Sequence, residues 1–469
     1  MLGKQDVNTD LFQCVSMEQL VPPNHMLRRL AAVMDLRFVR ESVAHLYSAV
    51  GRNSADPEVV VRMWILQHLY DFSERQICDE VTMHAGFRWF CGLSFNDAVP
   101  DQSTLVKLRN LKWADTGLWD KVLAATIGWC EAAGISRPGR MGIDGTQITA
   151  NAATVSLEQI PPPLRVVELE DAAPPRESAN VIEPVALVIE EGGNPREVRR
   201  SGDPEWHGEK FSNATHRSTT DPQARLYRKG KSQEAKLRYL GHYLADLRSG
   251  VIYGAVATQA TGTAEREAAL KLLDQLTTRP DELVMDLGYR DGEFLAAIIE
   301  RGVQPIVPLG QQPLEEVPTF ARRTFDMRKE LDRRSRQAAA RARNATRLAA
   351  RGSRGAAAQR QRTRLEHLIG EGKEHHGLDR AYARGLTRVD QQIKLTASVQ
   401  NLKRLVNSLR RGRGGAQALF GWQYNDAIFN WAAFPLSGAA KRRSSRRKRQ
   451  RIQRPGRHSY RNSQARPIR

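Results

Sequence analysis

Residues 141–152, MGIDGTQITANA, have the composition of a β-strand except at one position. The isoleucines and threonines are β-branched and favour strands, whereas Asp144 is a poor strand former. Gly145 follows the acid directly and leaves space beside it. A strand that carries an acid next to a glycine presents that acid at a sheet edge or crevice, where α/β sheets bind ligands. Asp144 is therefore a candidate functional residue of an α/β sheet.

Hydrophobic patterns on either side of this stretch predict the rest of that sheet. We expect five strands, at 140–150, 237–247, 251–258, 282–286 and 303–308, and helices at 264–276, 292–301 and 356–369. Their order predicts an α/β domain with a mixed sheet over residues 136–410. Two inserts are expected within it, at about 155–215 and 311–355. Much of the first is rich in Pro, Glu and Val and is typical of a linker.

Residues 1–135 are predicted to be all-helical. Asp56 and Pro57 are typical of an N-cap and first helical position, and Ser73 with Gln76 forms a capping-box pattern. A further helix is expected after Pro100. Short helices joined by tight turns fit a helix-turn-helix arrangement or, equally well, an ordinary helical bundle. Four basic residues favour contact with DNA: Arg88, Lys107, Arg109 and Lys112.

The net charge of +20 is concentrated in two segments. Residues 441–469 hold 13 of the 72 Lys and Arg residues and no acid, so the rest has 59 bases against 52 acids, or +7. Residues 322–364 hold 15 bases against three acids. A polyanion such as nucleic acid is the leading explanation. A solubilising tail, or translated sequence with no selected role, is the alternative for residues 411–469, which we expect to be disordered.

Other features indicate a cytoplasmic protein without membrane contact. No run of about 18 apolar residues is present, and the N-terminus lacks the pattern of a signal peptide. The four cysteines are widely spaced and form no CxxC pair, which is typical of reduced thiols rather than disulfides or a zinc site. They are Cys14, Cys78, Cys91 and Cys130.

Two more acids stand in positions that suit chemistry. Asp286 ends the predicted strand in VMDLGY, and Glu366 lies in RTRLEHLIGEGK, on one helix face with Arg362 and Lys373. Taken singly, each has a simpler explanation, as a turn former or a helical ion pair. Taken together with Asp144, three carboxylates repel unless a cation lies between them, and their oxygens suit Mg²⁺ or Mn²⁺. Two such ions about 3.5–4 Å apart would support cleavage of a phosphodiester.

Several segments in this order resemble one family. They include residues 54–77 and 88–109, IDGTQITANA, STTDPQARLYRKG, GTAEREAALKLLD, MDLGYRDGEF and a long block over 364–405. The chain resembles the DDE transposases of bacterial insertion sequences, in the group with an InsH-type N-terminal domain. The resemblance implies an RNase H-like catalytic domain in which Asp144, Asp286 and Glu366 are the catalytic and metal-binding triad, with two Mg²⁺ or Mn²⁺ ions.

The resemblance also implies roles for basic residues. The family's glutamate lies in a Tyr-Arg-Glu-Lys signature, which places Arg362 and Lys373 at DNA phosphates. Gln359 stands at the tyrosine position, so the chain departs from the signature there. Three further residues are expected to contact the DNA backbone: Arg225, Arg228 and Lys229.

The implied activity is strand cleavage and strand transfer at terminal inverted repeats. The expected partners are double-stranded DNA, as the element's ends and as target, and further copies of the chain in a homodimer or larger assembly at the nucleoid. Two alternatives remain. One is an RNase H-like nuclease that cleaves without joining strands, and the other is a decayed transposase that only binds DNA.

Overall fold

The computed structural model describes residues 15–160 apart from 49 and 52, and residues 211–228, 234–308, 325–349 and 354–410. The chain divides into two compact units, Met1–Gly421 and Trp422–Arg469. All described residues belong to the first unit, so the basic tail predicted for residues 411–469 lies outside them. None of the described helices is long and apolar enough to cross a membrane.

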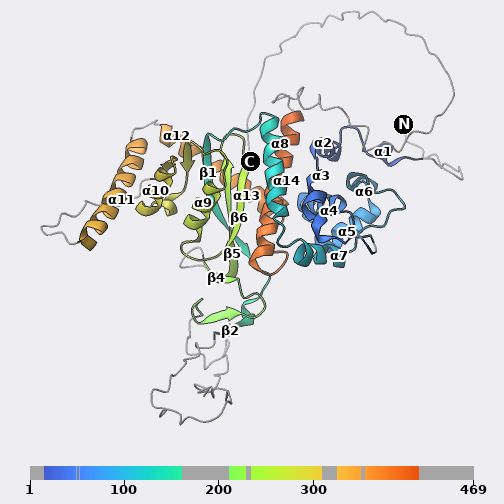
Figure 1. Cartoon of the computed structure of the whole chain (residues 1–469), viewed down its shortest axis with the longest axis horizontal. Coiled ribbons are helices and arrows are strands. Elements are labelled where there is room, and N and C mark those ends of the chain that lie inside the picture. Colours follow the sequence, from blue (N-terminus) through green and yellow to red (C-terminus); the bar gives the residue numbers. More distant parts are fainter. Residues whose placement is uncertain are drawn as a thin grey trace, which may run out of the picture. The chain divides into compact units, whose positions relative to one another are not determined.

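Helices alone make up the described chain before the first strand (Figure 1), as the sequence predicted. They are α1 (Met17–Leu20), α2 (Met26–Val33), α3 (Arg37–Val43), α4 (Pro57–Tyr70), α5 (Glu74–Met83), α6 (Ala85–Cys91), α7 (Gln102–Lys107) and α8 (Leu118–Ala132), with short turns η1 (Ala44–Leu46) and η2 (Leu108–Lys112). The predicted caps are confirmed. The Asp56 side chain accepts a hydrogen bond from Glu58 N at the start of α4, and Ser73 and Gln76 form the capping box of α5.

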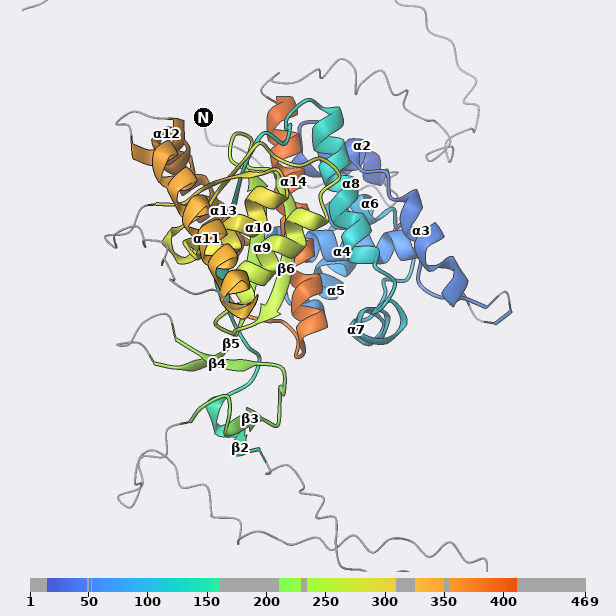
Figure 2. The same cartoon turned by 60° about the vertical axis from the view of Figure 1, so that its left-hand side comes forward.

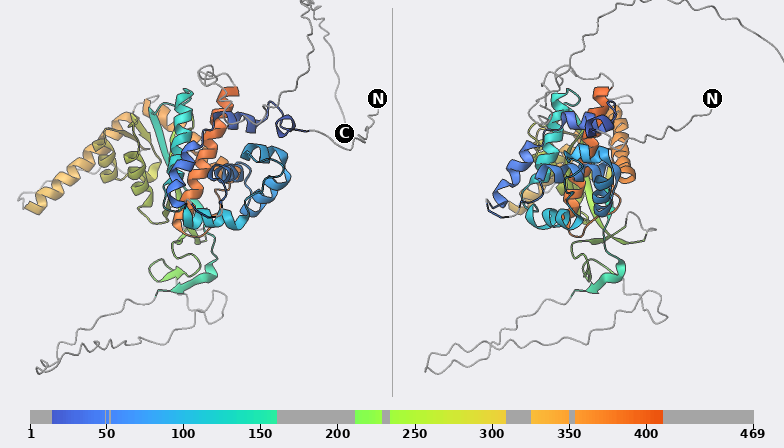
Figure 3. Two further views of the ribbon diagram at one scale, coloured as in Figure 1. Left: turned by 45° about the vertical axis from the view of Figure 1, so that its right-hand side comes forward. Right: turned by 90° about the vertical axis from the view of Figure 1, so that its right-hand side faces the viewer.

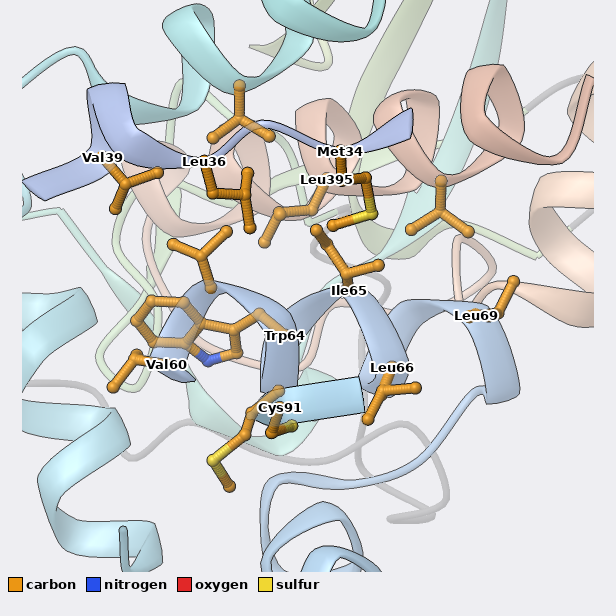
Figure 4. Packing of buried hydrophobic residues seen from close by; sticks show 14 of the residues in the cluster. Met34, Leu36, Val39, Val60, Trp64, Ile65, Leu66, Leu69, Cys91 and Leu395 are labelled. Atoms are coloured by element: carbon orange, nitrogen blue, oxygen red, sulfur yellow. The ribbon is translucent and has the colours of Figure 1, made fainter. Parts of the chain in front are cut away.

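The buried centre of this helical region surrounds Trp64 of α4 (Figure 4). Its ring lies edge-on to those of Trp113 and Trp119, with centroids 5.6 and 5.1 Å apart. Leu395 enters the same cluster from α14 (Leu386–Arg410), the last described helix. Helix α14 also runs beside α8 (Figure 3). The N-terminal helices therefore bury their core against an element from the other end of the chain.

Two of the four basic residues that favoured DNA contact are buried instead. The Arg88 guanidinium donates to the carbonyl oxygens of Ser94, Phe95 and Asp97, so it holds the turn after α6. Arg109 forms an ion pair with Glu74. Because both guanidinium groups are buried and bonded within the fold, neither is available to contact a DNA phosphate. Arg88 and Arg109 therefore stabilise the fold.

A six-stranded mixed sheet forms the middle of the described chain, in the order β4–β5–β1–β7–β8 with β6 also paired to β5. Its strands are β1 (Arg140–Thr149), β4 (Arg225–Tyr227), β5 (Lys236–Asp246), β6 (Ile252–Gln259), β7 (Glu282–Val284) and β8 (Gln304–Ile306). β1, β7 and β8 are parallel, whereas β5 is antiparallel to β1, β4 and β6. The five predicted strands are confirmed to within two residues at each end. Strands β2 (Leu157–Gln159) and β3 (His216–Ser218) form a separate pair.

Helices cover both faces of the main sheet (Figures 1 and 2). On one face, α9 (Ala264–Asp274) and α10 (Gly292–Glu300) pack on Met141 and Ile143 of β1. On the other face, α13 (Thr363–His375) and α14 pack on Ile148 and Val284. The sheet is thus the middle layer of a mixed α/β structure, as expected.

The helix predicted over 356–369 is not continuous. It is divided into α12 (Arg354–Gln361) and α13 at Arg362, and α11 (Phe325–Ala349) precedes it. Arg362 keeps helical backbone angles, φ −57° and ψ −30°, so the break is local and Arg362 stays one turn from Glu366. The periodicity did not reveal the break because the apolar spacing continues through it.

Candidate active site

Asp144, within β1, and Asp286, just after β7, lie at the same level of two neighbouring parallel strands. β1 and β7 are paired up to Gly142 and Val284, and each acid lies two residues beyond its paired residue. Because the pairing of β1 with β7 stops just before both acids, the two carboxylates lie near each other beyond the end of β7, and the charge of Asp286 raises the pKa of Asp144. Asp286 also caps the turn η4 (Leu287–Tyr289), accepting from Gly288 N at 2.9 Å.

Glu366 of α13 lies near Asp144, since its charge also raises the pKa of that residue. Gly142 explains how the helix comes so close, because a Cβ there would lie only 2.6 Å from Leu365 Cδ1. Asp144 lies two residues further along β1 and so shares that face of the sheet. The Glu366 side chain is 52% exposed and that of Asp144 is 17% exposed.

Arg362 joins the two acids. Its Nη1 donates to Asp144 Oδ2 at 2.9 Å, and its Nη2 donates to Glu366 Oε1. Burial raises the pKa of Asp144 to about 6, and the negative charges of Asp286 and Glu366 add to this rise. The Arg362 charge and the Gly145 N–H act in the opposite direction. The carboxylates are therefore close enough to repel, and a guanidinium relieves part of the repulsion.

Asp144, Asp286 and Glu366 offer carboxylate oxygens around a position that favours positive charge. Such oxygen ligands suit a hard divalent cation. In the part of the chain that the structure describes, no three His, Cys, Asp or Glu side chains already form a metal-ligating group. The Arg362 guanidinium instead pairs with both Asp144 and Glu366.

The other residues predicted to bind DNA lie further from Asp144 than Arg362 does. Lys373 Nζ donates to Gln147 O at 2.9 Å and pairs with Asp379, so it fastens α13 to β1. Arg225 lies beside Arg238 of β5, whereas Asp144 lies opposite Tyr243. Five residues of strand separate these levels, about 17 Å at 3.3 Å per residue. Arg228 is exposed, and Lys229 lies outside the described residues.

Gln359 has a definite structural role at the position where the resembling family has tyrosine. Its Nε2 donates to Met285 O at 3.0 Å and to Ile306 O at 2.8 Å. These carbonyls follow β7 and end β8, so Gln359 holds α12 against the strand ends that carry Asp286.

Sequence reasoning missed three polar side chains near these acids. Tyr289 is 1% exposed, and its burial together with the charges of Glu265, Asp144 and Asp286 raises its pKa well above the ordinary value. His242 is fully buried on β5 opposite Gly145. Glu265 begins α9 within the quoted segment GTAEREAALKLLD. The sequence shows an acidic residue in the first turn of a predicted helix. Only the packing of α9 on the sheet brings this residue near the strand that carries Asp144.

Comparisons with family models identify the class of protein. A family model described as a transposase domain (DUF772) matches residues 15–111, and a model described as a transposase DDE domain matches residues 212–402. The chain belongs to the DDE transposases of insertion sequences, as its sequence predicted, whereas the InsH-type N-terminal domain and the Tyr-Arg-Glu-Lys signature stay predictions. Such a domain implies a phosphodiester-cleaving enzyme that acts on DNA, and DDE transposases generally use divalent metals such as Mg²⁺.

The chain is also similar to the uncharacterized protein ORF8 in the nfe locus of Rhizobium meliloti. The two are 26% identical over 149 residues, which are 31% of this chain and 69% of that protein. No solved structure matches the chain significantly.

Proposed function

We propose that this transposase cuts DNA strands at the terminal inverted repeats of an insertion sequence and transfers the cut ends to target DNA. One observation carries the proposal: Asp144 of β1, Asp286 after β7 and Glu366 of α13 lie close enough for their charges to interact, and Arg362 joins two of them. In this proposal Asp144, Asp286 and Glu366 are the catalytic residues of an RNase H-like domain over residues 136–410. The order of the mixed sheet, with helices on both faces, supports that fold.

The remaining regions take complementary roles in the proposal. Residues 1–135 read the DNA ends, and residues 411–469 form a basic tail. Because α14 completes the core around Trp64, the two folded regions would move as one body on DNA. Two copies or more assemble on paired ends.

The three acids would hold two Mg²⁺ or Mn²⁺ ions. When bound, such ions activate first a water and then a 3′-hydroxyl, and stabilise the leaving oxygen of the phosphodiester. Arg362 turns from the carboxylates to a DNA phosphate, which its planar guanidinium can bind with two parallel hydrogen bonds. Lys373 keeps α13 in register with β1 and so keeps Glu366 near Asp144. Arg225, Arg228 and Lys229 add backbone contacts that carry no sequence information.

The test is Mg²⁺-dependent cleavage of a DNA fragment that carries the element's ends. Asp144→Asn, Asp286→Asn and Glu366→Gln are expected to abolish cleavage while binding of the same fragment persists. Asp281→Asn and Glu374→Gln are matched controls, because both acids are exposed and close in sequence to the proposed ligands. Normal cleavage by Asp286→Asn would refute the site assignment.

The same assay separates the two alternatives. A nuclease without strand transfer would release cut ends and never join them to a second DNA. A decayed, DNA-binding transposase would bind the fragment and leave it uncut with either Mg²⁺ or Mn²⁺.

A further inference from the structure

Three arginines form a row across the main sheet, beyond the level of Asp144. Thr149 of β1 lies opposite Arg238 of β5, and Arg238 lies opposite Arg225 of β4. On its other edge Thr149 pairs with Arg380, in the segment between α13 and α14. Residues directly opposite one another in a sheet share a face, so the three arginines lie on the same side of the sheet.

The arginine row lies where helix α9 stops covering this face. Leu240 of β5 shares the face with Arg238, because alternate residues of a strand point to the same side. Leu240 is 2% exposed and packs with Ala264 at the start of α9. One step further along the strand, Arg238 and its neighbour Arg225 are partly exposed, and Arg380 is exposed. The arginine row is therefore open to a large ligand.

Arg225 and Arg238 are a directly opposed pair of like charges, an arrangement that destabilises a sheet. Nη1 of Arg225 donates to the carbonyl oxygens of Pro222 and Ala224, at 2.7 and 3.1 Å. Nε of Arg238 is buried and has no hydrogen-bond partner among the described residues. An anion bound across the two strands would relieve the repulsion and accept from the remaining donors.

Two acids lie near the ends of the arginine row and have other partners. Asp379, at one end, pairs with Lys373 at 3.4 Å. Asp221, at the other end, is buried and accepts a hydrogen bond from the Tyr239 hydroxyl at 2.6 Å. Both carboxylates are thus engaged away from the arginines.

Glu265 is the acid that acts on the same surface from α9. Burial and the charge of Glu265 raise the pKa of Tyr227, whereas the charge of Arg238 lowers it. Tyr227 lies two residues beyond Arg225 on β4 and so has the same face. One carboxylate therefore faces three guanidinium groups, and the surface keeps a net positive charge.

A simpler role for these arginines is to stiffen the end of the sheet. The hydrogen bonds of Arg225 fit that role, because they hold the turn before β4. The role does not explain Arg380, whose exposed side chain makes no hydrogen bond or ion pair with the described residues. It also leaves unexplained why three like charges share one face of the sheet.

We propose that the row of Arg225, Arg238 and Arg380 is a DNA-binding surface separate from the metal site, and that it holds backbone phosphates. This inference rests on the proposed function. Three strand spacings of about 4.8 Å give the row a length of about 14 Å, or about four nucleotides of duplex at 3.4 Å each. The row lies about 17 Å along β1 from Asp144 and on the other face of that strand. It therefore binds DNA that flanks the cleaved position, or target DNA, and not the scissile phosphate.

Fluorescence anisotropy of a short labelled duplex of arbitrary sequence, titrated with the full chain at several salt concentrations, tests the inference. Arg238→Gln and Arg380→Gln are each expected to weaken binding about threefold to tenfold and to reduce the slope of log affinity against log salt by about one. Arg380→Lys should restore the slope, because it keeps the charge. Arg279→Gln is the matched control, since Arg279 is exposed and already pairs with Asp274.

Unchanged affinity and an unchanged salt slope in Arg238→Gln and Arg380→Gln would overturn the inference. Thermal melting shows whether each variant folds. Should Arg238→Gln not fold, Arg380→Gln decides by the same titration, because the Arg380 side chain makes no contact that the described residues would lose.

Cleavage and strand transfer by the same variants identify the DNA that the row holds. Slower cleavage of a fragment with the element's ends assigns the row to the flanks of those ends, whereas normal cleavage with less strand transfer assigns it to target DNA. The proposed function fails separately, if Asp286→Asn still cuts DNA. If Asp286→Asn is inactive while both arginine variants bind DNA normally, only the arginine row is wrongly assigned.

Discussion

Arg362 Nη1 lies 2.9 Å from Asp144 Oδ2, so a positive side chain at the α12–α13 junction neutralises the strand acid of the proposed triad. The other nitrogen of the guanidinium binds Glu366. A cation is thus supplied by the chain itself at the place where the proposed activity needs metal ions. In the proposed function, DNA phosphate and the carboxylates would compete for the same guanidinium, which would couple DNA binding to metal binding.

Arg362→Gln is therefore expected to bind Mn²⁺ about fivefold to tenfold more tightly without DNA, since an ion pair worth about 1 kcal/mol no longer competes. The same variant should lose affinity for DNA. By linkage, DNA should raise Mn²⁺ affinity in the wild type more than in Arg362→Gln. Arg360→Gln is the control for metal affinity, because Arg360 is exposed and contacts neither acid by a described ion pair. Unchanged or weaker Mn²⁺ binding by Arg362→Gln would disprove the competition.

Gln359→Ala is expected to lower the free energy of unfolding by about 1–3 kcal/mol, because two carbonyls at the strand ends lose their donor. Urea denaturation measures this change. Gln361→Ala, an exposed neighbour on α12, should cost much less. Cleavage should fall together with stability, since Met285 precedes Asp286. A fully stable Gln359→Ala protein would show that these hydrogen bonds do not hold α12.

Sequence patterns predicted the elements well where the signal is local. The Ser73 capping box and the strand that carries Asp144 depend on neighbouring residues alone, and both are confirmed. Arg88 and Arg109 were misjudged because their burial depends on turns and helices that fold back over them. The contacts of Gln359 and Glu265 likewise arise from packing between elements distant in the sequence. The sequence pattern predicted which helix or strand each residue belongs to, but not which distant residues it contacts.

Glu371 provides a pH-dependent link between α13 and α14. Burial alone would raise its pKa, but the neighbouring His376 and the charges of Arg404 and Lys403 hold the pKa of Glu371 well below its ordinary value. Lys403 Nζ lies 2.6 Å from Oε1, and Arg404 Nη2 lies 2.9 Å from Oε2. A lowered pKa in the folded state contributes stability above the unfolded pKa of about 4.3, and this stability is lost as the pH falls below it.

Glu371→Gln should accordingly lower the free energy of unfolding by about 2–3 kcal/mol at pH 7, somewhat less than for a fully buried pair because the side chain is 23% exposed. The difference from wild type should shrink as the pH falls from about 5 to about 3. Urea denaturation at several pH values measures it. Glu374→Gln, exposed on the same helix, should show no such trend. A difference that stays constant across this range would mean that Glu371 acts through packing rather than charge.

Gly142 sets the distance between β1 and α13, and hence between Asp144 and Glu366. A Cβ there would lie 2.6 Å from Leu365 Cδ1 and 2.7 Å from Leu247 Cδ2, both on buried side chains. Gly142→Ala should lower the free energy of unfolding by about 1–3 kcal/mol through overpacking. It should also reduce cleavage more than DNA binding, because α13 is pushed away from the strand.

Gly128→Ala is the matched control, since Gly128 lies in α8 with nothing within 4 Å of an added Cβ. Replacing a helical glycine with alanine should stabilise the protein by about 0.5–1 kcal/mol. Chemical denaturation and the cleavage assay, run on both variants, measure the two effects. If Gly142→Ala kept full cleavage while losing stability, the spacing of α13 from β1 would matter for folding alone, and Glu366 would tolerate a displaced helix.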